Sequence, residues 1–368
     1  KDQFLNGETL LHNDPYSGGT HLPDLTVVTP LLDKNKHKIL FFFANRAHHS
    51  DIGGIAPGSM PAFSKSILEE GLVFKGFSLL KNNKILDEKI IKELKITNFP
   101  SRDPEQNLND IKAQIASCKK GIAEMKKIID HYSLEIVNKY IKFVNKNCTE
   151  VIKKIIKNIK NASFSLPLDN GSIVKLTMGY NNKKKKLEID FNGTSKLLKN
   201  NFNTPKSVTR SVITYFLRTL VEEDIPLNEG VLKDVDLIFP KDSMLNPVFP
   251  APVVAGNVET SQTIIDVLNG ATSVQASCYG TMSNITFGNK SFGYYETICG
   301  GEGASYQNNG TDAVHCHMTN TSITDAEILE WNYPVRLLSF SIRKKSGGLG
   351  KWTGGNGTIR EILFLKNL

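Results

Sequence analysis

The spacing of apolar residues predicts long helices in the middle of the chain and short strands towards both ends. After Asp103 and Pro104, which favour the start of a helix, Leu108, Ile111 and Ile115 recur every three to four residues. We therefore expect a helix over SRDPEQNLNDIKAQIASCKKGIAEMKKIIDHY. Similar spacing predicts a second helix over SLEIVNKYIKFVNKNCTEVIKKIIKNIK and a third over SVTRSVITYFLRTLVEE.

Shorter apolar runs predict β-hairpins. LTVVTPLL and KILFFFAN are separated by DKNKH, and a turn centred on residues 35–36 would pair residues whose numbers sum to 71. GSIVKLTMGY and LEIDFNGTS flank the polar turn NNKKKK and predict a second hairpin. Further strands are expected in SNITFG, GYYETI, AVHCHMTN, VRLLSFSIR and TIREILFL.

The order of these elements indicates the fold class. A helix is expected over VVAGNVETSQTIIDVLNG, with Gly256 or Asn257 as its cap and Gly270 as its end. Helices and strands follow one another without a βαβ rhythm, which favours an α+β fold with mixed or antiparallel sheets. We expect two intimately packed subdomains and a lysine-rich helical middle section.

Composition divides the chain into three regions of one unit. Residues 1–84 are dense in Gly, Pro, His and aromatic residues and form a hairpin-rich region. Residues 85–245 form the helical, lysine-rich middle, and residues 246–368 form a glycine-rich α+β region expected to complete the site.

Composition also narrows the class of protein. The 368 residues are 40% hydrophobic and contain no run of eighteen apolar residues, so no membrane span is expected. No secretory signal is visible at the N-terminus. The five cysteines are odd in number and lack CxxC spacing, which argues against a disulfide framework and favours the cytoplasm.

The net charge of +8 comes from the middle of the chain. Residues 119–200 hold 18 Lys, no Arg and 7 acidic residues, so the remainder of the chain is slightly acidic. Nucleic-acid binding normally uses arginine forks and aromatic stacking, and KKKK at 183–186 has neither. We therefore expect no nucleic-acid partner, and an exposed lysine-rich excursion away from the functional site.

Candidate chemistry gathers at the open end of the first hairpin. His21 and Asp24 lie on one side of this hairpin and His48, His49 and Asp51 on the other. Mixed imidazole and carboxylate donors suit Zn²⁺, Mn²⁺ or Fe²⁺, so His21, Asp24, His48 and Asp51 are predicted metal ligands. His49 is a spare ligand or a catalytic base. The alternative is a group of hydrogen-bonded loop histidines that only caps the hairpin.

Two further groups are weaker candidates. His315 and His317 stand two apart in an expected strand and would share one face; they could complete the metal shell, act as catalytic acid and base, or simply pack. Two glycine-rich stretches, GYYETICGGEGAS and SGGLGKWTGGNGT, could present backbone N–H groups to an oxyanion, although tight turns explain them equally well. Neither matches a nucleotide-binding motif. Cys299, beside Gly300, is not favoured as a nucleophile.

Eight long strings in a fixed order span almost the whole chain: NDPYSGGTHLPDLTVVTP, ANRAHHSDIGG(x)₂PGSMP, RDPEQNLNDIKAQIA, GNVETSQ, GTMSNITFG, YYETICGG(x)GA, HMTNT(x)₂TDAEILE and SGG(x)GK(x)₂GGNG. Together they resemble the hydantoinase B family. That family includes the C-terminal half of ATP-dependent 5-oxoprolinase, subunits of N-methylhydantoinase and the large subunits of acetone-type carboxylases. GNVETSQ and TDAEILE look most like the 5-oxoprolinase branch.

The resemblance implies an ATP-driven hydrolysis of a cyclic amide, divided between two parts. A hydantoinase A-like partner would bind ATP and phosphorylate the lactam oxygen of 5-oxoproline. The B-like part, represented by this chain, would open the ring to glutamate in an oligomeric, metal-dependent enzyme of glutathione metabolism. Asn257, Gly300, Gly301 and Gly303 are the expected substrate-binding residues.

The chain also departs from the family pattern. It is expected to start and stop inside the B unit. Ser322 and Thr353 stand where relatives usually carry Arg, a residue suited to a substrate carboxylate or phosphate. N-methylhydantoinase, an acetone-type carboxylase subunit and an inactive homologue that only binds a partner remain as alternatives.

Overall fold

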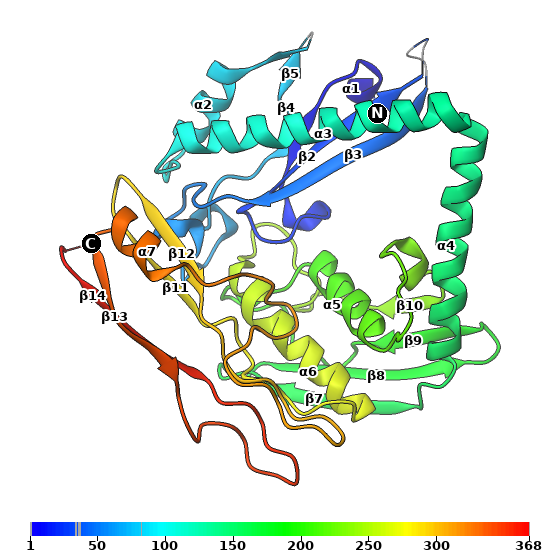
Figure 1. Ribbon diagram of the computed structural model, residues 1–368, viewed down its shortest axis with the longest axis vertical. Coiled ribbons are helices and arrows are strands. Elements are labelled where there is room, and N and C mark those ends of the chain that lie inside the picture. Colours follow the sequence, from blue (N-terminus) through cyan, green and yellow to red (C-terminus); the bar gives the residue numbers. More distant parts are fainter. Residues whose placement is uncertain (1, 34, 36–37, 82, 368) are drawn as a thin grey trace.

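A four-stranded antiparallel sheet carries the first hairpin. The computed structural model describes residues 2–33, 35, 38–81 and 83–367. The sheet has the order β3-β2-β1-β4, and its strands are β1 (Leu10–His12), β2 (Asp24–Leu32), β3 (Ile39–His48) and β4 (Lys75–Ser78). β2 and β3 are the long blue strands in the upper part of Figure 1. Their paired ends bring Asp24 opposite His48.

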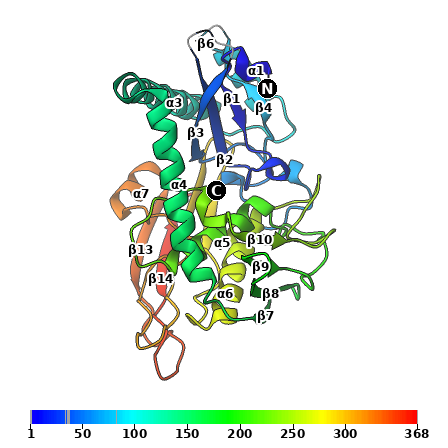
Figure 2. The same ribbon diagram turned by 90° about the vertical axis from the view of Figure 1, so that its right-hand side faces the viewer.

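The two long helices α3 (Pro104–Tyr132) and α4 (Leu134–Ile156) lie where the spacing of apolar residues predicts helices. The side chain of Asp103 accepts a hydrogen bond from the Gln106 amide and so begins α3, which packs across β2 and β3. α4 turns away from α3 at Ser133 and runs down to the second sheet (Figure 2). The short α1 (Asp2–Leu5) and α2 (Asp87–Lys95) and the small hairpin of β5 (Leu80–Lys81) and β6 (Lys84–Ile85) complete this part.

A second sheet lies at the lower end of the view in Figure 1, with the order β10-β9-β8-β7. Its strands are β7 (Ala162–Pro167), β8 (Ile173–Asn181), β9 (Lys186–Asp190) and β10 (Val235–Ile238). The β9–β10 pair is parallel and the other two pairs are antiparallel, so this sheet is mixed. α5 (Lys206–Thr219) and α6 (Ser261–Thr272) pack beside it.

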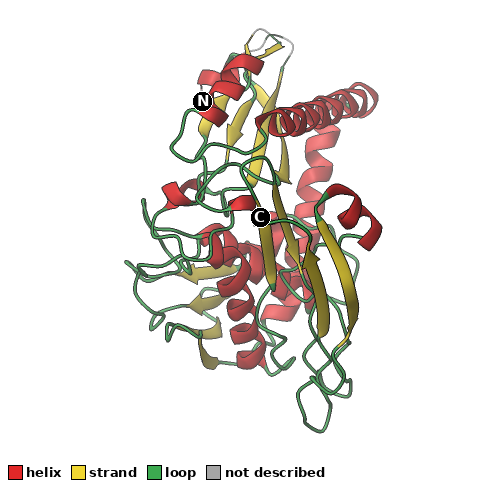
Figure 3. Cartoon of the chain, turned by 90° about the vertical axis from the view of Figure 1, so that its left-hand side faces the viewer, coloured by secondary structure: helices red, strands yellow, loops and turns green. Residues whose placement is uncertain are grey.

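Two separate hairpins occupy the C-terminal region (Figure 3). The first consists of β11 (Asn284–Gly288) and β12 (Gly293–Thr297), and the second of β13 (Val335–Ile342) and β14 (Thr358–Phe364). α7 (Ala326–Asn332) packs against β13. Helices together with mixed and antiparallel sheets confirm the α+β prediction.

The apolar interior contains two large buried clusters. One joins the first sheet to the first half of α3, from Leu11 through Cys118. The other joins the second sheet to α4, α5 and α6, from Cys148 through Leu268. The three-region division of the chain stays a prediction.

Three local predictions were wrong. The Leu32–Ile39 pair beside the turn sums to 71 as expected, but a bulge between Leu31 and Leu32 shifts the register, and the pairs from Leu31–Phe41 to Asp24–His48 sum to 72. The expected turn centre lies partly outside the described residues. Gly270 does not end α6, which continues to Thr272 and stops where Ser273 takes a left-handed conformation. AVHCHMTN is irregular apart from one bridge at Val314.

The lysine-rich stretch is exposed where its charge is densest. Residues 183–185 form the solvent-facing turn between β8 and β9, and one face of α4 is open to solvent. Among the described residues, no helix has the length and apolar content needed to cross a bilayer.

Candidate metal and catalytic site

The loop before β2 is fixed by a buried asparagine. The Asn13 amide group donates to the carbonyls of Leu22 and Leu72, and its oxygen accepts from the Phe74 amide. The Asn13 side chain is fully buried, and its three hydrogen bonds connect the loop to the segment 72–74 of the same chain. His21 is therefore held close to Asp24 at the start of β2.

Three predicted ligands meet at the open end of the first hairpin, and we call His21, Asp24 and His48 the hairpin-end cluster. His21 Nδ1 lies 3.2 Å from Asp24 Oδ2, and the His21 and His48 rings lie 5.1 Å apart. Thr20 donates a hydrogen bond to the same Asp24 oxygen. Tyr295 of β12 stacks on His48 at 5.2 Å and covers one face of its ring.

Burial and charge set the protonation of the cluster. Burial raises the pKa of Asp24, but the charge of His21 and the hydrogen bond from Thr20 outweigh it and hold the pKa below its usual range. The surrounding protein and the charge of His21 lower the pKa of His48, although the His48 ring keeps an exposed edge. The cluster therefore contains a carboxylate and a neutral imidazole at pH 7.

These residues fit a divalent metal ion by donor type and by proximity. The buried Nδ1 atom of His21 makes no well-aligned hydrogen bond among the described residues, and its neighbour at 3.2 Å is the carboxylate of Asp24, so both side chains can turn towards a metal ion. Within the described part of the chain, however, no three His, Cys, Asp or Glu side chains already converge closely enough to hold one ion. Binding a metal requires the side chains to turn towards a common point.

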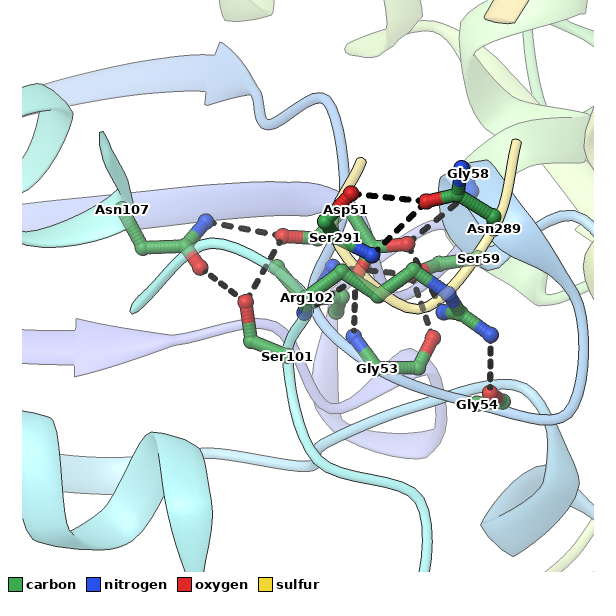
Figure 4. Close-up of polar contacts among 11 residues, drawn as sticks. Asp51, Gly53, Gly54, Gly58, Ser59, Ser101, Arg102, Asn107, Asn289 and Ser291 are labelled. Atoms are coloured by element: carbon green, nitrogen blue, oxygen red, sulfur yellow. Dashed lines mark hydrogen bonds and ion pairs between the residues drawn. The ribbon is translucent and has the colours of Figure 1, made fainter. Parts of the chain in front are cut away.

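The side chain of Asp51 lies among Gly53, Gly58 and Arg102 (Figure 4). Its Oδ1 accepts from the backbone amides of Gly53 and Arg102. Its Oδ2 accepts from the Gly58 amide and forms a 2.9 Å ion pair with Arg102 Nη1. Because both oxygens serve these bonds, Asp51 fixes the segment 49–59, which we call the Asp51 loop, to the start of α3. The role of Asp51 as a metal ligand stays a prediction.

Gly53 shows how closely this loop approaches the segment before α3. Its φ is +90°, and a Cβ there would lie 2.2 Å from the Phe99 carbonyl oxygen. Only glycine accommodates this conformation and this contact together.

His49 faces away from the cluster. It is fully buried, its Nε2 lies 3.1 Å from the Gln114 side-chain oxygen, and its Nδ1 lies 3.0 Å from the Asn107 amide nitrogen. These partners require Nε2–H to donate and Nδ1 to accept, and burial lowers the pKa of His49. Both nitrogens of a neutral ring are used, which leaves none for the predicted role of spare ligand or base.

His315 and His317 do not share a strand face, because their segment is not a strand. Neither ring nitrogen of His315 has a hydrogen-bond partner among the described residues, and burial lowers its pKa. His317 has a φ of +52°, and its Nε2 lies 3.0 Å from Cys278 Sγ. Its Nδ1 lies 3.3 Å from the Tyr215 hydroxyl. Catalytic roles for the two histidines stay predictions.

The predicted substrate-binding glycines pack against other backbone. A Cβ on Gly301 would lie 1.9 Å from the Gly355 carbonyl oxygen, so the two glycine-rich stretches touch. Gly300 pairs with Val314 in an isolated bridge, and Gly303 donates its amide to Cys278 Sγ. Tight packing explains these positions, and their role in substrate binding stays a prediction.

Asn257 lies in a π-helical turn, Gly256–Thr260, that precedes α6 directly. Such turns are rare and often mark functional sites. Gly256 allows the turn to pack closely against the backbone at Asn203. A Cβ on Gly256 would lie 2.0 Å from the Asn203 carbonyl oxygen. Glu259 of the same turn accepts from Thr281, and burial raises its pKa.

Sequence reasoning missed several polar residues in these regions. Arg102, Tyr295 and the Cys278–His317 pair were not singled out. Tyr295 lies in the string YYETICGG, which was one of the family-like strings. No pattern in the sequence near Tyr295 indicates its contact with His48. These contacts join residues far apart in the chain, and no spacing rule reports them.

Comparison with known proteins identifies the family. The family model described as hydantoinase B/oxoprolinase matches residues 1–368. The chain is 44% identical to a 5-oxoprolinase of Dictyostelium discoideum and 43% identical to 5-oxoprolinase 1 of Arabidopsis thaliana. Each match covers 99% of this chain, but 29% and 31% of those relatives, respectively.

A solved structure shows the same fold. The ATP-dependent caprolactamase of Pseudomonas jessenii superposes with a TM-score of 0.84 at 23% identity, over 99% of this chain and 66% of that one. The matches to the two 5-oxoprolinases and to the family model extend over essentially all of the sequence. The chain belongs to the hydantoinase B/oxoprolinase family.

Proposed function

We propose that this chain is the ring-opening part of an ATP-dependent 5-oxoprolinase. Its identity to two proteins of that name over 99% of its length is the observation that carries the proposal. Those relatives are about three times as long, which leaves room for a hydantoinase A-like part that binds ATP. The chain itself contributes no recognised nucleotide motif.

The chemistry of a lactam explains why two parts would be needed. Amide resonance makes the ring carbon a poor electrophile, and phosphorylation of the lactam oxygen by the partner would activate it. Water then adds to that carbon and the ring C–N bond breaks, which frees the amine and leaves an acyl phosphate. A second water displaces the phosphate and yields glutamate.

The hairpin-end cluster would hold a divalent metal ion through His21, Asp24 and His48. Such an ion, when bound, polarises a carbonyl oxygen or activates a water molecule. Asp24 contributes negative charge, and the lowered pKa of His48 keeps its ring neutral and able to bind the metal. Tyr295 fixes the orientation of the His48 ring by stacking on it. His48 is exposed to solvent as a residue, which supports access of substrate to the cluster.

Reconstitution tests this function. The purified chain would be combined with a hydantoinase A-like partner, ATP and 5-oxoproline, and released glutamate would be measured. We expect glutamate only when both proteins are present, and a loss of at least about 100-fold in His48→Ala. His131→Ala, in the last turn of α3, is the matched control and should retain activity.

Other outcomes would contradict the proposal. Turnover of N-methylhydantoin instead of 5-oxoproline would assign the chain to another branch of the family. ATP hydrolysis by the isolated chain would contradict the division of labour. Binding of the partner without turnover of any cyclic amide would identify an inactive homologue, as the residues Ser322 and Thr353 allow.

A further inference from the structure

A second chemical centre lies in the glycine-rich region. Cys278 follows α6 and lines a cavity of about 420 Å³, which we call the glycine-loop cavity. The walls of this cavity include Tyr279, Arg343 and Trp352, together with glycines of both glycine-rich stretches. Cys278 is partly exposed, whereas the other four cysteines are buried.

Two donors contact the Cys278 sulfur. His317 Nε2 lies 3.0 Å from it, and the Gly303 amide donates to it at 3.3 Å. The Cys316 thiol is a neighbour of this sulfur and donates to the Val314 carbonyl oxygen at 3.6 Å. Hydrogen bonds from several donors stabilise a thiolate more than a thiol.

The wider surroundings support an ion pair between Cys278 and His317. The Tyr215 hydroxyl contacts the far nitrogen of His317, so the ring is held from both sides. Hydrogen bonding to Cys278 raises the pKa of His317 against the effect of burial, and Asp266 and Glu302 raise it further. The imidazolium form of His317 then stabilises the Cys278 thiolate.

The pKa of Cys278 follows from this arrangement. The neighbouring Cys316 thiol is the largest cause, and with His317 and Gly303 it lowers the pKa to about 5 although burial opposes the change. The same contact and burial raise the pKa of the Cys316 thiol, so Cys316 keeps its proton. One thiolate and one neighbouring thiol therefore lie side by side at the cavity.

We propose that Cys278 is a site of thiol–disulfide exchange for small disulfides that enter the glycine-loop cavity, with Cys316 as the resolving thiol. In the first step the Cys278 thiolate attacks one sulfur of the small disulfide. A mixed disulfide forms, the original S–S bond breaks, and one small thiolate leaves and takes up a proton.

In the second step Cys316 loses its proton and attacks the Cys278 sulfur. The mixed disulfide breaks, the second small thiol is released with that proton, and a Cys278–Cys316 disulfide remains. Two protein thiols are thereby oxidised, and one small disulfide is reduced to two thiols. This chemistry does not depend on the proposed lactam hydrolysis.

The pH profile of alkylation tests the first step without any substitution. The full-length chain would be treated with iodoacetamide between pH 4 and pH 9, and the labelled cysteines identified by mass spectrometry. We expect one labelled residue at pH 6, Cys278, with an inflection near pH 5. An ordinary thiol has its inflection near about 8.5.

The expected rate advantage at pH 6 is about tenfold over an ordinary exposed thiol. A larger thiolate fraction favours Cys278 by roughly 300-fold, but the lower basicity of its sulfur reduces its nucleophilicity by roughly 30- to 40-fold. His317→Gln should move the inflection towards that of an ordinary thiol. Cys299→Ser, in the neighbouring glycine-rich stretch, is the matched control and should leave the profile unchanged.

Exchange with 2-hydroxyethyl disulfide tests the second step. We expect the wild-type chain to end with a Cys278–Cys316 disulfide and no bound fragment. Cys316→Ser, which replaces the resolving thiol with a hydroxyl of similar size, should retain the mixed disulfide. Uniform labelling of all cysteines, or an inflection near about 8.5 in the wild type, would overturn the proposal. A mixed disulfide that persists in the wild type would overturn the role of Cys316.

Discussion

The hairpin-end cluster includes His48, and the Asp51 loop begins at the next residue, His49, yet the two regions have different environments. His48 lies beside His21 and Asp24 and keeps an exposed edge, whereas His49 is fully buried beneath α3. Successive residues of a strand point to opposite faces, so one step along the chain separates the two environments. A run of metal-type side chains is therefore not one site.

Hydrogen-bond saturation distinguishes the two regions further. In the Asp51 loop, the carboxylate of Asp51 and both ring nitrogens of His49 are engaged by partners from the loop and from α3. In the hairpin-end cluster, His21 Nδ1 makes no well-aligned hydrogen bond among the described residues, and its neighbour at 3.2 Å is another predicted ligand, Asp24. Saturated polar groups hold a fold together, while unsaturated ones are available to a ligand. We expect substitutions in the two regions to separate stability from metal binding.

The largest effect on stability is expected from Asp51→Ala. It would leave Arg102 as a buried charge without its partner and remove the acceptor of three backbone amides. Breaking such a buried pair costs about 3–5 kcal/mol in the free energy of unfolding, measurable by urea denaturation. A folded variant of unchanged stability that had lost metal would instead make Asp51 a ligand.

A smaller effect is expected from the titration of His48. Its pKa is lower in the folded chain than in the unfolded chain, where it is about 6.5, so the unfolded state binds more protons below that pH. Stability should therefore fall as the pH falls from about 6.5 through the folded pKa. Solvent at the exposed edge of the ring limits the slope to at most about 1 kcal/mol per pH unit.

Unfolding of wild type and His48→Gln at matched pH values isolates this contribution. The variant should lose part of the slope in that window. Asp24 acts in the same direction at lower pH, because its lowered pKa provides stability that is lost as the pH falls below about 3.9. Equal slopes in both proteins would show that His48 titrates normally.

The smallest effect is expected from the lysine-rich turn, which belongs to neither region. Changing Lys183, Lys184, Lys185 and Lys186 to Gln removes exposed charge and the surface ion pairs with Glu188 and Asp236. Turnover should stay within about twofold, because salt screens exposed charges over about 10 Å. Retention on heparin should decrease. A large loss of turnover at fixed salt would bring these lysines into the site.

Local sequence signals predicted the elements better than the contacts between them. Leu108, Ile111 and Ile115 placed α3, and all three are buried in the first core. The hairpin was predicted, but its register was not, because the bulge at Leu31 and Leu32 carries no sequence mark. The hairpin brings Asp24 and His48 together, and the loop before β2 adds His21.

Contacts made by distant segments could not be predicted in this way. Asp51 has the residue type of a ligand, and only its tertiary partners, Arg102 above all, show that its oxygens are engaged. Cys278 and His317 lie 39 residues apart and meet through irregular backbone that was expected to be a strand. Irregular segments follow no periodicity, so their side-chain contacts are visible only in the folded chain.

Metal content most directly tests the separation of the two regions. Wild type, His48→Ala and His49→Ala would be purified alike and analysed for bound transition metal, with folding confirmed by circular dichroism. We expect roughly stoichiometric metal in the wild type, its loss in His48→Ala, and its retention in folded His49→Ala with reduced stability. A wild type without metal, or equal loss in both variants, would contradict this account.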